Sequence, residues 1–295
     1  SPTDLSIGDF FYRECIMNKQ CHGWVISAIR GVLVVVGEHV KQSQGFRAAS
    51  TRCSNYWIFS LSITALASLP AMGQVIPNRS APASQQALIF NAPNGVPIAN
   101  IQTPSGGGVS RNRYSQFDVR SQGVILNNAQ DATETQLSGW ILGNSLVAGR
   151  PAKIILNEVN STNPSQLLGT IEVAGNKAQI VVANSSGITC NGCGFINATG
   201  VTLSTGEPRL SADGNLEGYR VTRGQIRIEG QGMNASAVST TDVIARAVQI
   251  NAGLWANYLR MTLGANEVNA DNTQATPIDF NLNQANARDR KSTRL

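Results

Sequence analysis

The segment from Lys177 to Asn197 restricts the possible folds of this chain more than any other part of the sequence. It contains three short apolar runs, Ala178–Ala183, Ile188–Cys190 and Gly194–Asn197, separated by Asn, Ser and Gly. Asn and Gly accept the left-handed backbone that tight corners need, and runs this short suit small strands. The segment therefore predicts a chain that coils through small β-sheets.

The same pattern of short apolar runs continues on both sides of this segment. Each run is rich in branched residues and is bounded within a few positions by Gly, Asn, Ser or Pro. No stretch of about 12 residues keeps a clear 3.6-residue apolar period, so we expect little helix. The further runs lie at residues 87–91, 124–128, 153–157, 170–173, 225–229, 243–251 and 259–264.

The spacing of the runs favours a solenoid over a β-sandwich. Val182, Val201, Val221, Val243 and Leu263 follow one another at intervals of 19, 20, 22 and 20 residues, near the short end of solenoid repeats. Sandwich strands recur about every 8–12 residues and are joined by hairpins. Hairpin turns are few here, with one expected at residues 93–96. A solenoid needs its open end covered, and we assign that role to residues 75–120.

The charge distribution gives no indication of a nucleic-acid partner. The net charge is +5 and only 14% of residues are charged, against about 25% in an ordinary domain. Residues 74–287 contain thirteen basic and thirteen acidic residues, whereas phosphate binding needs clustered Lys and Arg. Arg111 and Arg113, beside Tyr114, are expected in an exposed turn.

The N-terminal region is typical of a secretory leader. An apolar run at 57–69 follows basic residues and ends in small ones, so we predict a signal peptide at 17–73, cleaved between Gly73 and Gln74. The alternatives are a membrane anchor or a buried helix, but the run is shorter than the about 20 residues of a membrane span. Residues 1–16 are expected to be an upstream extension, and 288–295, which resemble a translated sequencing adapter, a non-natural tail.

Cys190 and Cys193 form the sharpest local motif, and three interpretations compete. A redox pair belongs at a helix N-terminus, and a zinc site needs four ligands. After residue 73 the chain has no histidine and no other cysteine. A local disulfide suits an exported chain and contributes about 2 kcal/mol by the chain-entropy estimate. We favour the disulfide and expect no metal.

The same composition argues against an enzyme. Mechanisms that use histidine are excluded after residue 73 because both histidines, His22 and His39, precede it. The acidic residues are scattered singly, as on a solvated surface. We therefore expect no catalytic residue and no cofactor. The single acids considered are Asp118, Glu158, Glu172, Asp213, Glu217, Glu229 and Asp242.

Several segments together resemble the secretion domain of two-partner secretion exoproteins, the group of filamentous haemagglutinins and contact-dependent inhibition toxins. They lie at residues 108–117, 123–128, 155–159, 181–197 and 252–256. The leader from Met17 resembles the extended signal peptide of these proteins. The resemblance implies an all-β fold, a right-handed parallel β-helix with an N-terminal cap and a small extra-helical hairpin, over residues 74–287.

The resemblance also implies a route and a partner. It predicts export by the general secretory machinery and recognition in the periplasm by a cognate outer-membrane β-barrel transporter with soluble periplasmic domains. The product would be secreted or displayed on the surface of a Gram-negative cell. Two turns of the family carry over, the first to Asn184, Ser185, Ser186, Gly187 and Ile188.

The second family turn falls on Gly143 and Asn144, in the sequence Gly-Asn-Ser-Leu, and the Cys-x-x-Cys variant points to the toxin and haemolysin-like branch. We therefore predict a non-enzymatic secretion-targeting domain of a large exoprotein. A cell-surface receptor would be bound by a further part of that protein. The alternatives are an adhesin domain for cell-surface glycans and, behind it, a β-helix enzyme that cleaves polysaccharides.

Overall fold

The computed structural model describes residues 13–14, 22–26, 33–36 and 75–278, which belong to two separate units. The N-terminal unit contains an antiparallel sheet of β1 (Arg13–Glu14), β2 (His22–Ile26) and β3 (Leu33–Val36). The predicted cleavage site at Gly73 and Gln74, most of the predicted leader and the 288–295 tail lie outside the described residues. No helix in the described part of the chain is long and apolar enough to cross a membrane.

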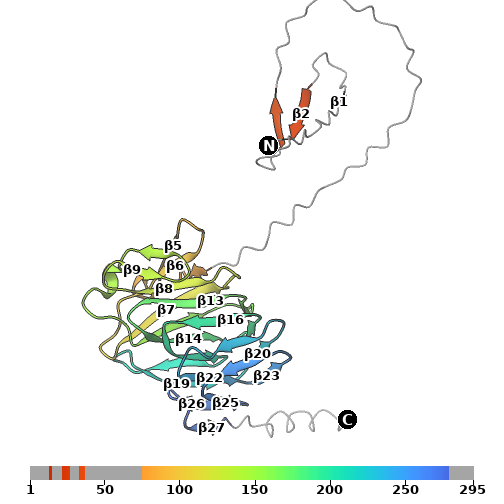
Figure 1. Cartoon of the computed structure of the whole chain (residues 1–295). Coiled ribbons are helices and arrows are strands. Elements are labelled where there is room, and N and C mark those ends of the chain that lie inside the picture. Colours follow the sequence, from red (N-terminus) through yellow and green to blue (C-terminus); the bar gives the residue numbers. More distant parts are fainter. Residues whose placement is uncertain (1–12, 15–21, 27–32, 37–74, 279–295) are drawn as a thin grey trace, which may run out of the picture. The chain divides into compact units, whose positions relative to one another are not determined.

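The second unit is a right-handed parallel β-helix, as predicted (Figure 1). Three sheets run along it, and consecutive coils contribute neighbouring strands to each sheet. The first sheet consists of β4 (Val75–Pro77), β7 (Val109–Phe117), β11 (Ile154–Val159), β14 (Ala178–Asn184), β17 (Ala198–Ser204), β22 (Thr240–Ala245) and β25 (Leu259–Leu263).

The other two sheets complete each coil. The second consists of β5 (Leu88–Asn91), β6 (Pro97–Asn100), β8 (Val124–Asn128), β13 (Thr170–Gly175), β16 (Cys193–Ile196), β21 (Met233–Ala235) and β24 (Leu254–Ala256). The third consists of β12 (Ser165–Leu167), β15 (Ile188–Cys190), β20 (Gln225–Ile228) and β23 (Ala247–Ile250).

The corners of the coil at residues 178–204 are made as the sequence predicts. Gly187, Gly192 and Asn197 have φ angles of 122°, 82° and 54°, in the left-handed region that Gly and Asn tolerate. The Asn197 Nδ2 also donates to the carbonyl oxygens of Val173 and Gly175 in the previous coil, at 2.7 and 2.9 Å. The corner residues therefore turn the chain and also tie successive coils together.

The interior of the helix is filled by alternate residues of each strand. In the first sheet Ile155, Ile180 and Val201 lie in register and are buried in the main core. Near the N-terminal end Tyr114 and Phe117 are completely buried, with ring centroids 5.0 Å apart. This apolar column is what the short branched runs of the sequence supply, and its burial stabilises the stack.

An N-terminal cap covers the first coil, as expected for residues 75–120. Here β4 pairs antiparallel with β7, and β5 pairs antiparallel with β6. The predicted hairpin at residues 93–96 joins β5 to β6: the Ala92 N–H donates to Val96 O at 2.9 Å, and Gly95 has a φ of 84°.

Two extra-helical elements pack on the outer faces of the sheets. A four-stranded antiparallel sheet buries an apolar layer against the first sheet, in which Tyr219, Val221 and Val268 meet Leu156 and Val181. A hairpin of β9 (Thr133–Thr135) and β10 (Gly139–Ile141) covers part of the second. The four-stranded sheet consists of β18 (Glu207–Leu210), β19 (Leu216–Val221), β26 (Asn266–Asn269) and β27 (Ala275–Pro277).

This larger sheet corrects the predicted spacing of the coils. Val221 belongs to extra-helical β19 and not to a coil. Val182 pairs with Leu203, and Leu203 pairs with Val243, which lies 40 residues further along the chain. The predicted coil period is therefore wrong at Val221. The strands of the extra-helical sheet have the same short apolar pattern as coil strands, so the sequence does not distinguish them.

Candidate functional site

The first predicted turn, at the end of β14, is built around the side chain of Asn184. This side chain is fully buried. Its Oδ1 accepts from the Ser186 N–H at 2.9 Å, and the backbone carbonyl of Asn184 accepts from the Gly187 N–H at 3.0 Å. Its Nδ2 donates to Asn163 O at 3.1 Å and to Ser165 Oγ at 3.0 Å. One carboxamide thus closes the turn and fixes it to the preceding coil.

Close packing holds the same turn on its other side. A Cβ on Gly187 would lie 2.8 Å from the Gln225 carbonyl oxygen, so the next coil leaves no room for a side chain. Ser185 Oγ accepts from Arg223 Nη2 at 3.0 Å, and Ser186 Oγ donates to Ser161 O at 2.6 Å.

The second predicted turn repeats this geometry. Asn144 is also fully buried; its Oδ1 accepts from the Leu146 N–H at 3.1 Å and its carbonyl accepts from the Val147 N–H at 3.0 Å. Its Nδ2 donates to the carbonyl oxygens of Ile101 and Asn127, at 2.8 and 3.0 Å. The turn opens the short 3₁₀ helix η2 (Ser145–Val147). Two separate corners of the solenoid therefore use one hydrogen-bond pattern, although the second has Val147 at the position that Gly187 takes in the first.

Burial divides the predicted residues into those that lie inside the turns and those that reach the surface. Asn184, Gly187 and Ile188 are buried, as is Asn144, whereas Gly143, Ser185 and Ser186 are partly exposed. In each turn the residue directly after the buried asparagine is a serine, Ser145 or Ser185, that reaches the surface. The sequence did not distinguish these two groups, because burial depends on coils about 20 residues away.

Cys190 and Cys193 form a disulfide in the structure, with their Cα atoms 5.4 Å apart. Both residues are buried at the corner between β15 and β16, three and six positions after Gly187. The bond closes a very short loop on strand and turn, not at a helix N-terminus. At this position the disulfide supports the corner that follows the first turn.

The basic pair near the first turn was predicted wrongly. Arg111 and Arg113 lie in β7 and not in an exposed turn, and Tyr114 is completely buried. Arg111 Nη2 lies 2.7 Å from Glu158 Oε2, and Arg113 Nε lies 3.3 Å from Glu158 Oε1. These two ion pairs result from the strand register, which places Glu158 of β11 opposite Arg113 of β7.

Two further carboxylates, Glu172 and Asp242, support the structure locally. Glu172 accepts from the backbone N–H groups of Gln136 and Leu137 and so anchors the β9–β10 hairpin. Asp242 is paired with Arg260, which raises the pKa of that guanidinium through their hydrogen bond. Within residues 75–278 no three His, Cys, Asp or Glu side chains gather in a way that could hold a metal ion.

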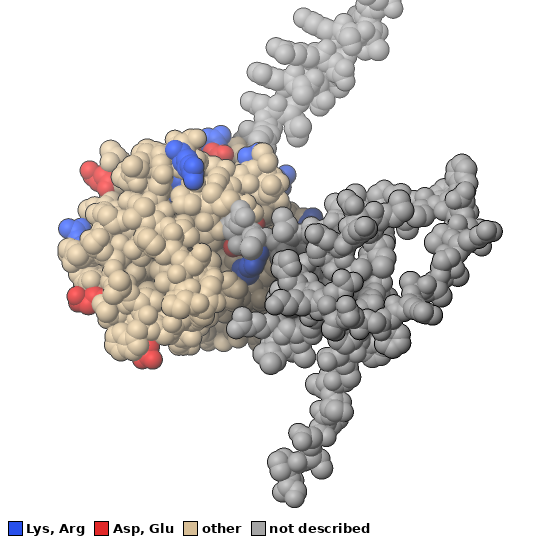
Figure 2. All heavy atoms as spheres, turned by 90° about the horizontal axis from the view of Figure 1, so that it is seen from above, with Lys and Arg blue, Asp and Glu red and all other residues tan. Residues whose placement is uncertain are grey.

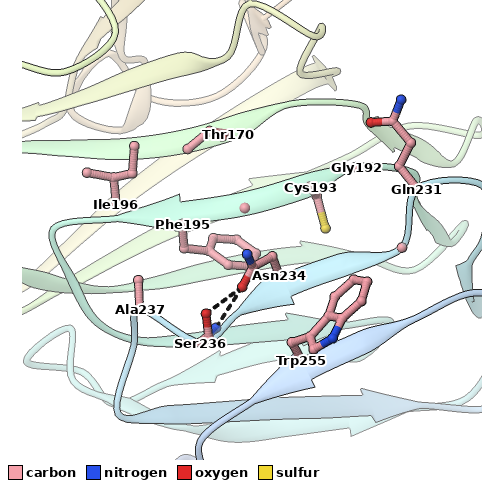
Figure 3. A pocket seen from close by; sticks show the side chains of 12 residues that line it. Thr170, Gly192, Cys193, Phe195, Ile196, Gln231, Asn234, Ser236, Ala237 and Trp255 are labelled. Carbon is pink, nitrogen blue, oxygen red and sulfur yellow. Dashed lines mark hydrogen bonds between the residues drawn. The ribbon is translucent and has the colours of Figure 1, made fainter.

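The surface of the described body is mainly uncharged. Figure 2 shows basic and acidic side chains scattered singly over one face. A depression of about 450 Å³ lies on the outer face of the second sheet, where Phe195, Asn234 and Trp255 line it (Figure 3). The Asn234 Oδ1 accepts from Ser236 Oγ at 2.7 Å. Gly192 and Cys193, four and five residues after the first predicted turn, also line this depression, which the sequence pattern does not predict.

These features define a class of protein: a capped parallel β-helix with two rigid asparagine-anchored corners, an extracellular type of surface and a local disulfide. Residues 73–292 match the family described as the TPS secretion domain. The chain belongs to this family.

Similar proteins agree with this assignment. The chain is 46% identical over 288 residues to "Toxin CdiA" of Yersinia pestis, covering 93% of this chain and 8% of that protein. It is 39% identical over 277 residues to "tRNA nuclease CdiA-2" of Burkholderia pseudomallei, covering 90% of this chain and 9% of that protein. The chain therefore spans less than a tenth of the length of these relatives.

A solved structure, the crystal structure of the filamentous hemagglutinin secretion domain, superposes with a TM-score of 0.61 and 34% sequence identity, over 70% of this chain and 68% of that one. The chain is thus a secretion domain of an exoprotein that passes through the periplasm to the surface of a Gram-negative cell. The matched family is one of secretion domains and is not catalytic. The nuclease activity in the second relative's name refers to that relative and not to this chain.

Proposed function

We propose that this domain is recognised in the periplasm by the soluble part of a cognate outer-membrane transporter, and that the two asparagine-anchored turns are part of the recognised surface. The observation that carries the proposal is their shared construction: two corners of one solenoid each bury an asparagine and present the following serine, Ser145 or Ser185. Rigid, preorganised corners lose little conformational entropy on binding.

The solenoid itself suits such export. Each coil stacks only on its neighbours, so a coil that emerges outside the cell can fold onto the previous one, and this directional folding opposes return. The general secretory machinery would deliver the unfolded chain to the periplasm, where this domain would fold before it is recognised; the coils that follow it in the exoprotein would fold onto it outside the cell. Any cell-surface receptor would then be bound by a further part of the exoprotein.

A paired substitution at Ser145, which is exposed, and Ser185, which is partly exposed, tests the recognised surface. We expect Ser145→Gln with Ser185→Gln to lower the secreted fraction at least tenfold, because the longer side chains obstruct a close contact while the buried asparagines stay in place. The free energy of unfolding should change by less than about 0.5 kcal/mol, as is usual for surface substitutions.

The matched control is Ser121→Gln with Ser239→Gln, two exposed serines elsewhere on the body. This control should be secreted normally. Equal secretion of the two double variants, measured by immunoblot of culture medium and cells, would count against recognition through the turns.

A further inference from the structure

The strand β5 ends the second sheet, and its outer edge has no backbone partner among residues 75–278. The Ala92 N–H donates to Val96 O, and Pro97, which has no N–H, lies opposite Asn91. Because hydrogen-bonded and non-hydrogen-bonded pairs alternate, the N–H and C=O groups of Ile89 and Asn91 point away from β6. They form an open template for another strand.

This edge lacks the usual protection against strand addition. Its sequence, Leu-Ile-Phe-Asn, contains no charge and no proline, which are common means of blocking an edge. Leu88 and Phe90 are 50% and 53% exposed. They are two positions apart and so lie on one face of the strand.

An apolar groove adjoins this face. It has a volume of about 360 Å³ and lies between the β5–β6 hairpin and β10, with Phe90, Trp140 and Leu142 among its lining residues. Trp140 and Leu142 are 72% and 82% exposed. No charged residue lines the groove. An exposed apolar patch of this kind on a polar surface marks an interaction site.

The groove is continuous with the second turn. Its lining extends to Gly143, the residue before the buried Asn144. Its floor is fixed, since Asn127 Nδ2 donates to Asn100 Oδ1 at 2.8 Å and to Leu142 O at 2.9 Å. A partner that contacts Ser145 therefore comes directly beside the groove.

From this arrangement we infer that the β5 edge and the adjoining groove dock an extended, apolar strand of the transporter's periplasmic part. The strand adds to β5 through the free backbone groups of Ile89 and Asn91, and one of its apolar side chains enters the groove beside Phe90. The absence of charge on both surfaces selects an apolar segment over an acidic or basic one. This inference rests on the proposed function, and it adds the mode of binding and the chemistry of the partner segment.

Photo-crosslinking in cells that make the full chain and its transporter tests the docking mode. A photoreactive phenylalanine analogue is placed at Phe90, at Ser185 or at Trp255 in separate chains. We expect crosslinks to the transporter from positions 90 and 185 and none from 255. A crosslink from 185 but not from 90, or a crosslink from 90 to a second copy or to the chain's own leader, overturns the inference and leaves the proposed function standing. No crosslink from either position overturns both.

A matched pair of substitutions gives an independent measurement. Phe90 and Trp255 are 53% and 54% exposed, so Phe90→Lys and Trp255→Lys make comparable changes at the two sites. We expect Phe90→Lys to lower the secreted fraction at least tenfold and Trp255→Lys to leave it unchanged, with urea midpoints equal to that of the parent chain. Equal secretion of the two variants overturns the inference.

Discussion

Replacement of Asn184 by alanine is expected to lower the free energy of unfolding by about 3 kcal/mol and to reduce export. The substitution leaves Asn163 O, Ser165 Oγ and the Ser186 N–H without the partner they have in the structure. Buried polar groups that lose a partner cost about 1–3 kcal/mol each, and partial access of water reduces their sum. Urea unfolding of the purified chain measures the loss of stability, and the secreted fraction measures export.

Asn234 provides a matched control for this substitution. Its Oδ1 also accepts from the N–H two residues on, at 3.1 Å, but the bond is exposed to solvent. Asn234→Ala should therefore cost less than about 1 kcal/mol, since water replaces the lost partner, and secretion should not change. A similar loss of stability in both variants would show that the buried contacts of Asn184 do not anchor the turn.

The second large effect is expected from Gly187→Ala, with a loss of about 2–4 kcal/mol. The φ of 122° at Gly187 is unfavourable for any residue with a Cβ, and that atom would lie 2.8 Å from the Gln225 carbonyl oxygen. Backbone strain and a steric clash with the next coil therefore add. The expected readout is a lower urea midpoint with an unchanged slope.

Gly149→Ala is the control, because a Cβ at that position meets no atom within 4 Å and its φ is not in the left-handed region. Its urea midpoint should equal that of the parent chain. If Gly187→Ala unfolds at the same urea concentration as Gly149→Ala, the first turn is not held by the close packing described above.

Much of the coil geometry could be predicted because it depends on neighbouring residues in the sequence. The left-handed corners at Gly187, Gly192 and Asn197 follow from residue type alone. The strands near them follow from short branched runs, and their stacking into a solenoid follows from the small number of hairpin turns between the runs. The family resemblance then placed the two turns at segments that share one hydrogen-bond pattern.

What could not be predicted depends on contacts between distant coils. Val221 carries the same local signal as a coil strand, but it packs on the outside of the first sheet. The sequence predicts Arg113 in an exposed turn, whereas the strand register places it opposite Glu158. The open β5 edge was also missed, because a run such as residues 87–91 gives no information about which of its neighbours will pair with it.

The secreted fraction of the full chain, in two strains that differ only in the presence of the cognate transporter gene, tests the central claim most directly. The account predicts that the chain reaches the medium or the cell surface when the transporter is present, and that it is retained in the periplasm when the gene is deleted. Equal amounts outside the cell in both strains would contradict it.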